Sequence, residues 1–110
     1  MLIAVAGPYS ADSNEQRQRN LDSLNEAAAV IFELGHIPVI GVNAALPIVE
    51  CLGADSDRYE AMMMISLALI DKCDAILMIG NSPGANRERD LIKSKGLPVY
   101  EDVNDIPAAS

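Results

Sequence analysis

The sequence predicts an α/β fold, a doubly wound and mostly parallel sheet of four to five strands with helices on both faces. Short apolar runs alternate with longer amphipathic segments in the order β-α-β-α-β-α-β. The first run, residues 2–6, is apolar throughout, as in a strand that is buried on both faces. The 110 residues are half hydrophobic, so they suffice for one domain over 1–110 with a core of its own.

The first long helix is predicted after this strand, over 14–34. Its apolar residues recur at intervals of three and four with charged residues between them. Ser13 or Asn14 suits the N-cap, and Gly35 ends the helix. Residues 37–40 then read as a short second strand, and the proline within it places that strand near an edge or its own start.

The middle of the chain carries weaker signals. The stretch 41–57 is predicted to be irregular, with one helical turn around 45–51 and a polar loop at its end. Asp57 suits the N-cap of a helix over 58–72. This helix is apolar on nearly every side, so we expect it to be deeply packed or to form a subunit interface of a homo-oligomer.

The remaining elements complete the doubly wound pattern, which is the flavodoxin-like or Rossmann-like arrangement. Residues 75–79 form the third strand and 85–94 a helix that Gly96 closes. Residues 97–100 form the fourth strand, and a short helical turn is expected in the tail.

Composition and charge exclude several classes of partner. The net charge of −8, without a cluster of Lys or Arg, disfavours binding to a nucleic-acid polymer. The sequence contains no run of about eighteen apolar residues, so we expect no membrane partner. Cys51 and Cys73 lack metal or redox spacing and are expected to be buried in a reducing cytoplasm. We expect a cytoplasmic protein with no metal and no cofactor.

Two loop signatures follow strands of the predicted sheet, Gly7-Pro8-Tyr9-Ser10 and the segment 82–88. In an open parallel sheet, ligands bind outside the carboxyl ends of the strands, so both loops should meet at one site. Ser82 and Gly84 would place a hydroxyl and free N–H groups at a helix N-terminus, which favours a phosphate or carboxylate. Glu88 lies one helical turn further on.

Each signature also has an ordinary structural explanation. The first is compatible with a plain strand-to-helix turn in which Tyr9 packs over the sheet edge. Glu88 could be a solvated surface acid that pairs with Arg87 or Lys93. Only the combination of the two loops favours a small-molecule site.

The order of motifs resembles the nucleoside 2-deoxyribosyltransferase-like superfamily over nearly the whole chain. The resemblance rests on 3–10, 34–39, 67–77, 82–88 and 95–99. It is strongest toward small bacterial and phage members, and more distant toward 2′-deoxynucleoside 5′-monophosphate N-glycosidases. It implies cleavage or transfer at the N-glycosidic bond of a deoxynucleoside or its 5′-monophosphate.

The resemblance also implies roles for individual residues. Glu88 matches the glutamate that attacks the anomeric carbon, Tyr9 the tyrosine that positions it and the sugar, and Ser82 the serine that holds a 5′-phosphate. Active members carry an aspartate eight residues before the position of Asp74, where this chain has Ser66. A serine cannot supply an acid for the leaving base, and neither Asp71 nor Asp74 is a clear substitute.

The candidate site comprises catalytic and substrate-binding residues. The candidate catalytic residues are Glu88 and Tyr9. The candidate substrate-binding residues are Gly7, Pro8, Ser10, Asn43, Ser82, Gly84 and Asn86. Asn43 is included because it follows the second strand. Asp57, Arg58 and Tyr59 are further candidates for covering the pocket, although Asp57 also suits the N-cap of the helix that begins there. The alternative function is a non-catalytic module that binds or senses a nucleotide and has lost the acid.

Overall fold

Four parallel strands form one sheet in the computed structural model, which describes residues 1–53 and 55–109. The strand order is β2-β1-β3-β4. The elements are β1 (Leu2–Ala6), α1 (Asn14–Glu33), β2 (Ile37–Val39), α2 (Gly41–Val49), α3 (Arg58–Ile70), β3 (Ala75–Met78), α4 (Pro83–Ser94), β4 (Val99–Tyr100) and a 3-10 turn (Val103–Asp105). The predicted α/β class and parallel sheet are confirmed. Ala54 of the predicted polar loop and Ser110 of the tail lie outside the described residues.

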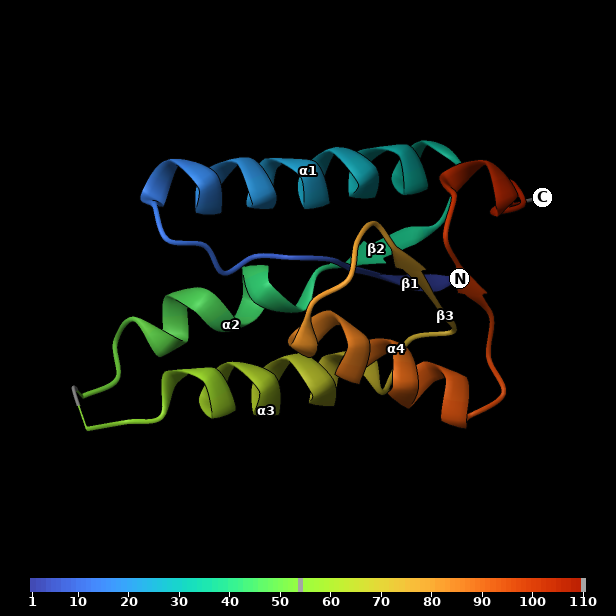
Figure 1. Cartoon of the computed structure of the whole chain (residues 1–110). Helices are drawn as coiled ribbons and strands as arrows, with labels where there is room; N and C mark the ends of the chain where they lie inside the picture. The colour runs from blue at the N-terminus through green and yellow to red at the C-terminus, as the bar shows by residue number, and fades with distance from the viewer. Residues whose placement is uncertain (54, 110) are drawn as a thin grey trace.

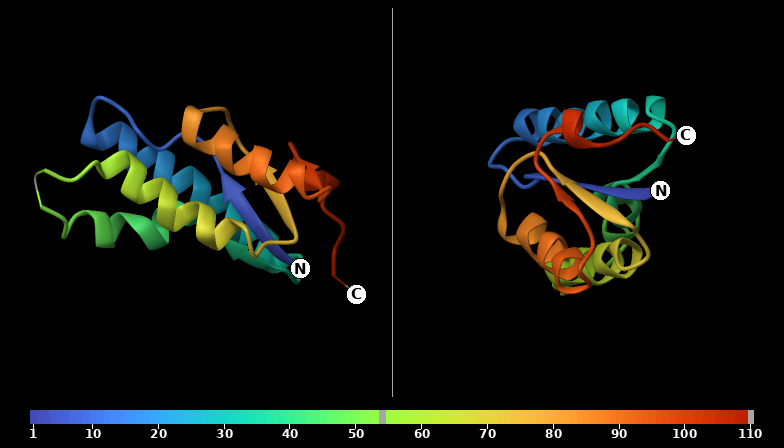
Figure 2. Two further views of the ribbon diagram at one scale, coloured as in Figure 1. Left: turned by 90° about the horizontal axis from the view of Figure 1, so that it is seen from below. Right: turned by 90° about the vertical axis from the view of Figure 1, so that its right-hand side faces the viewer.

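Helices cover both faces of the sheet, as Figure 1 shows. The helix α1 runs along one face together with the C-terminal turn, while α3 and α4 lie against the other (Figure 2). Successive side chains of a strand point to opposite faces, so β1 contributes to two cores. Ile3 and Val5 pack in the core under α1, whereas Ala4 and Ala6 pack in the core formed with α3 and α4.

The predicted helix boundaries have the expected local causes. The side chains of Ser13 and Asp57 cap α1 and α3 by accepting a hydrogen bond from the backbone N–H three residues on, at 3.1 and 3.0 Å. Gly35 and Gly96 follow α1 and α4 with φ of +92° and +74°, which glycine adopts without strain. The other predicted bounds differ from the observed ones by one or two residues.

The prediction of an irregular stretch over 41–57 is wrong for its first half. Residues Gly41–Val49 form α2, although Pro47 lies inside the helix and cannot donate a backbone hydrogen bond. Ala45 and Val49 are buried on one face of α2, and α2 packs along α3. This tertiary packing outweighs the local signals of the glycine and the proline.

The apolar helix over 58–72 is observed as α3 and ends at Ile70. It buries Met63, Ser66 and Ile70, which lie on one face, while Met64 is 72% exposed. Met64 is therefore a large apolar side chain without cover in the described part of the chain. Within residues 1–53 and 55–109, none of the helices combines the length and apolarity needed to cross a bilayer.

Candidate functional site

The sheet topology brings the two loop signatures to the same place. The chain leaves β1 for β2 on one side and later returns to β3 on the other side of β1. This reversal is a topological switch point, where open α/β sheets form their ligand crevice. Because β1 and β3 are parallel neighbours, the loops that follow them begin side by side. A cavity of about 270 Å³ lies at this point.

Five segments of the chain line the cavity. They are the end of β1 with its loop, α1, the start of α2, α3, and the start of α4. The predicted site residues on its wall are Gly7, Tyr9, Ser10, Ser82, Gly84 and Glu88. The structure therefore brings six of the nine predicted residues together around one cavity.

Glu88 lies on the buried face of α4, between Ala85 and Ile92. Residues at these spacings share one side of a helix, so the carboxyl group points to the sheet and not to solvent. Glu88 is only 8% exposed, and its Oε1 accepts a hydrogen bond of 2.6 Å from the Ser66 hydroxyl. This burial excludes the alternative in which Glu88 is a solvated surface acid.

The environment of Glu88 opposes its ionisation. Burial raises the pKa of the Glu88 carboxyl above its usual value, and the hydrogen bond from Ser66 offsets part of this effect by lowering it. A carboxylate that is buried in a cleft at a raised pKa is poorly solvated, which favours attack on, or stabilisation of, a cationic centre in a ligand. Such a group is a candidate functional residue on physical grounds.

A close contact between α2 and α3 fixes Ser66 beneath Glu88. A side chain at Gly41 would place its Cβ 1.8 Å from the Ser66 Oγ. Only glycine therefore lets the start of α2 approach α3 this closely. Gly41 and Ser66 both line the cavity, so the floor of the site depends on this packing.

The loop after β3 offers few donors to a ligand. Ser82 caps α4 by accepting from the Ala85 N–H at 3.1 Å, and its carbonyl accepts from the Asn86 N–H at 2.8 Å. Pro83 has no N–H. The Gly84 N–H has no partner among the described residues, so it and the Ser82 hydroxyl are the groups left to bind an anion.

Two tyrosines contribute to the wall. Tyr9 comes from the loop after β1, and Tyr59 from the first turn of α3. The guanidinium of Arg87 lies 5.8 Å from the centre of the Tyr59 ring and pairs with Glu60 at 2.9 Å. No hydrogen bond joins Tyr9 to Glu88 in the described residues, and the hydroxyl that holds Glu88 is that of Ser66.

Three predicted binding residues do not lie on the cavity. Pro8 packs its ring against the backbone of Gly80. Asn43 lies in the first turn of α2, a helix that the sequence did not predict. Its side chain donates a hydrogen bond to the Asn25 side chain of α1 at 2.7 Å and does not reach the cavity. Asn86 accepts a hydrogen bond from Arg89 on its own helix at 3.4 Å. The wall of the cavity therefore does not include these three residues.

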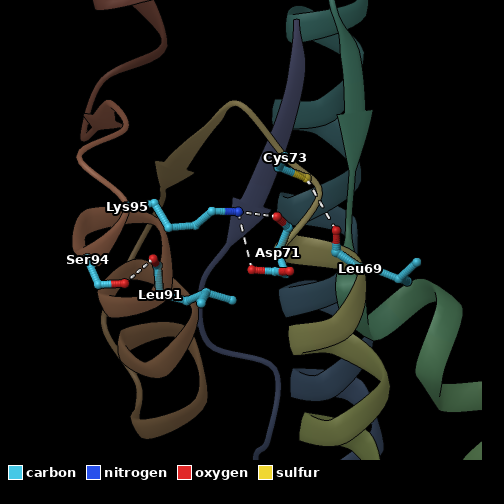
Figure 3. Close-up of polar contacts among 6 residues, drawn as sticks. All are labelled: Leu69, Asp71, Cys73, Leu91, Ser94 and Lys95. Carbon is cyan, nitrogen blue, oxygen red and sulfur yellow. Dashed lines mark hydrogen bonds and ion pairs between the residues drawn. The ribbon is translucent and has the colours of Figure 1, made fainter.

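The two aspartates near β3 lie at the opposite end of the strand from the cavity. Asp71 ends α3 and pairs with Lys95 at 3.2 Å, as Figure 3 shows. Asp74 accepts from the Leu2 N–H at 2.8 Å, before β1 and β3 begin to pair. Neither carboxylate lies on the wall of the cavity. The described residues also contain no cluster of three or more His, Cys, Asp or Glu able to hold a metal ion.

Sequence reasoning missed part of the wall. Gly41, Val42 and Met63 line the cavity but were not among the predicted site residues. A signal existed for Gly41, since it comes soon after β2 at the carboxyl end of the sheet, where Val39 ends the strand. Met63 gave no signal beyond that of an ordinary core residue.

The comparisons with known proteins agree with this architecture. The model of a family described as a domain of unknown function, DUF4406, matches residues 1–101. Among solved structures, a 2-deoxyribosyltransferase from Bacillus psychrosaccharolyticus superposes with a TM-score of 0.63 at 18% identity. The alignment covers 100% of this chain and 93% of that one. At this identity the likeness shows the fold alone. A comparison with curated proteins gives no match.

Proposed function

The chain belongs to the DUF4406 family, whose description assigns no activity, and we propose that it cleaves or transfers the N-glycosidic bond of a nucleoside or its 5′-monophosphate. Glu88 would be the nucleophile that attacks the anomeric carbon. The observation that carries the proposal is the buried Glu88 carboxyl group on the wall of a cavity at the switch point of the sheet.

The chemistry suits a single carboxylate in an enclosed site. Loss of the base leaves an oxocarbenium-like centre, which a nearby carboxylate can stabilise and then trap as a glycosyl ester. Attack by water on this ester gives hydrolysis, whereas attack by a second base gives transfer. The likeness in fold to a protein named as a 2-deoxyribosyltransferase supports the same class of substrate. Tyr9 and Tyr59 would contact the sugar or stack on the base.

A specific observation favours a second candidate, a module that binds or senses a nucleotide without cleaving it. Where active members of the superfamily that the motifs resemble carry an aspartate, this chain has Ser66, whose hydroxyl donates to Glu88. In this alternative the cavity would bind its ligand in the same place, and the ligand would be released unchanged.

The experiment that tests the proposal has two stages. A panel of ribo- and deoxynucleosides and their 5′-monophosphates is first screened by thermal shift, because a ligand of the native state raises its apparent stability. Release of free base from each ligand is then measured by chromatography with the wild type and with Glu88→Gln. Release that requires Glu88 supports the enzyme. Binding without release from any ligand supports the sensing module.

Ser66 is expected to set the pH at which Glu88 ionises. Ser66→Ala removes the hydrogen bond that lowers the Glu88 pKa, so this pKa should rise further. The ascending limb of kcat/KM, which reports the essential base of the free enzyme, should therefore move to higher pH. Direct titration of the Glu88 carboxyl carbon by NMR measures the same shift without a substrate.

The matched control for this change is Ser94→Ala. The Ser94 hydroxyl donates to the Leu91 carbonyl on the exposed side of α4, at 2.7 Å (Figure 3). Its removal should leave the titration of Glu88 where it is. An unchanged Glu88 pKa in Ser66→Ala would contradict the assigned hydrogen bond.

We also propose that the protein forms a homo-oligomer through α3. Met64 is 72% exposed and Leu69 38%, so α3 keeps apolar side chains on its outer surface. Light scattering coupled to size exclusion should give at least the mass of a dimer. Met64→Glu should shift the population toward the monomer, and a wild-type monomer at micromolar concentration would refute the interface.

A further inference from the structure

One carboxyl group lies on the wall of the cavity, and no second acid of similar strength lies there among the described residues. Among the described residues on its wall, Glu88 is the single carboxyl group, and none is Asp, Lys, Arg or His. The remaining acidic side chains on the wall are the phenols of Tyr9 and Tyr59, and a phenol is a much weaker acid than a carboxyl group. The site therefore contains one group suited to attack and none suited to protonate a leaving base near neutral pH.

The side chain that contacts the Glu88 carboxyl group is a hydroxyl and not a second acid. The Ser66 Oγ donates to Glu88, and the backbone of Gly41 lies so close that even a methyl group there would overlap it. Ser66 is 2% exposed. The hydrogen-bond partner of Glu88 is thus a hydroxyl, which stabilises the carboxylate and does not release its proton at physiological pH.

The leaving group must then depart without help from the protein. When the bond between the anomeric carbon and the base breaks, its electron pair goes to the base nitrogen. A neutral purine or pyrimidine becomes an anion unless an acid protonates it, whereas a base that already carries a positive charge leaves as a neutral molecule. We infer, resting on the proposed function, that the site acts on N-glycosides of cationic bases, such as purines alkylated on the imidazole ring or N-glycosylated pyridiniums.

The reaction balances with water as the only co-reactant. A Glu88 oxygen forms a bond to the anomeric carbon as the bond to the base breaks, and the base keeps the electron pair and becomes neutral. Water then attacks the anomeric carbon, and the ester bond breaks with its pair returning to the Glu88 carboxylate. The proton lost by water goes to solvent. The products are the free sugar, the neutral base and one proton.

The electrostatics of the site favour a cationic ligand. The chain has a net charge of −8, and the wall supplies no positive side chain among its described residues. A positive charge a few ångströms from Glu88 also favours the ionised form of the carboxyl group, which is the form that attacks. The mostly apolar surroundings, with Met63 and Leu24 on the wall, strengthen this attraction by excluding water.

The test compares substrates that differ in one methyl group. The values of kcat/KM for base release are measured for 2′-deoxyguanosine and 7-methyl-2′-deoxyguanosine, and for the matching ribonucleosides, with the rate in Glu88→Gln subtracted as the uncatalysed background. General acid catalysis contributes about a hundredfold or more, so the methylated substrates should exceed the neutral ones by at least about a hundredfold. The pH profile for the methylated substrates should show one ascending limb and no descending limb from an essential acid.

The outcomes separate the inference from the proposed function. Release from neutral and methylated substrates at similar kcat/KM, dependent on Glu88, would overturn the inference and leave the glycosidase intact. Such a result would place an acid on the site from outside the described wall, for example from a second copy of the chain. Release from neither class would overturn the proposed function and the inference together.

Discussion

Glu88→Gln is expected to raise the thermal stability of the protein at neutral pH and to reduce base release by at least about a thousandfold, as removal of a nucleophile does. Both effects have one cause. The carboxyl group lies on the wall of the cavity, where burial opposes its ionisation. The amide has nearly the same shape, and its oxygen can still accept the hydrogen bond from Ser66.

The sign of the stability change follows from proton linkage. The pKa of Glu88 is raised in the folded state by burial, so the folded protein binds this proton more tightly than the unfolded chain does. The contribution of the carboxyl group is thus favourable at low pH, and stability is lost as the pH rises from the unfolded pKa through the folded pKa. Glutamine does not titrate, so its advantage should appear above this window and vanish below it.

Denaturant melts of the wild type and Glu88→Gln between pH 4 and pH 8 measure this difference. Asp90→Asn is the matched control, since Asp90 lies on the same helix and its side chain is 66% exposed in a pair with Arg89. The control should show no comparable dependence on pH and should keep its activity. A Glu88→Gln protein less stable than the wild type at pH 8 would show that the ionised carboxyl group stabilises the fold.

The elements that the sequence predicts well are those with strong local signals. The strand 2–6 is apolar throughout because it is the buried neighbour of two strands. Ser13 and Asp57 can each satisfy a free N–H of the turn that follows, and this requirement fixes the helix starts. Gly35 marks a positive φ, which other residues rarely adopt.

The helix α2 could not be predicted in the same way, because its stability comes from contacts distant in sequence. Pro47 and Gly41 both lower helix propensity, and the N-cap position, Ile40, has no side chain able to accept a hydrogen bond. What holds α2 is its packing along α3, which neither segment reveals alone. Without this helix, the sequence places Asn43 in a turn that faces the ligand, whereas its side chain bonds to Asn25 of α1.

The place of the candidate site in the fold could be predicted from the sequence, whereas the contacts within the site could not. The rule that ligands bind at the carboxyl ends of parallel strands brought Tyr9 and Glu88 into one hypothesis. The spacing of Glu88 from Ala85 and Ile92 also places it on the buried face of α4. The hydrogen bond from Ser66 depends on the relative depth of α3 and α4, which no sequence pattern specifies.

Gly41→Ala is expected to destabilise the protein, by about 1 to 3 kcal/mol as overpacking typically does, although alanine is the better helix former. The added Cβ would lie 1.8 Å from the Ser66 Oγ, 2.7 Å from its Cβ and 3.2 Å from its Cα. The backbone cannot yield easily at this point, because Ser66 lies within α3 and Gly41 opens α2. The serine hydroxyl must therefore leave its place beside Glu88, or the two helices must separate.

Gly53→Ala is the matched control for this substitution. No described atom lies within 4 Å of a Cβ at Gly53, and its φ is not positive. The same chemical change should there be neutral or slightly stabilising, because alanine restricts the unfolded chain. The difference between the two variants in chemical denaturation thus isolates the steric contact at Gly41.

A second substitution at Ser66 separates a local clash from general damage to α2. Ser66→Gly removes the two atoms that an alanine at position 41 would overlap most, and by itself it should cost about 1 kcal/mol as a glycine within a helix. Combined with Gly41→Ala, it should recover much of the lost stability, so the two changes should be strongly non-additive. Additive losses would show that the clash is relieved in another way and that Gly41 does not hold Ser66 against Glu88.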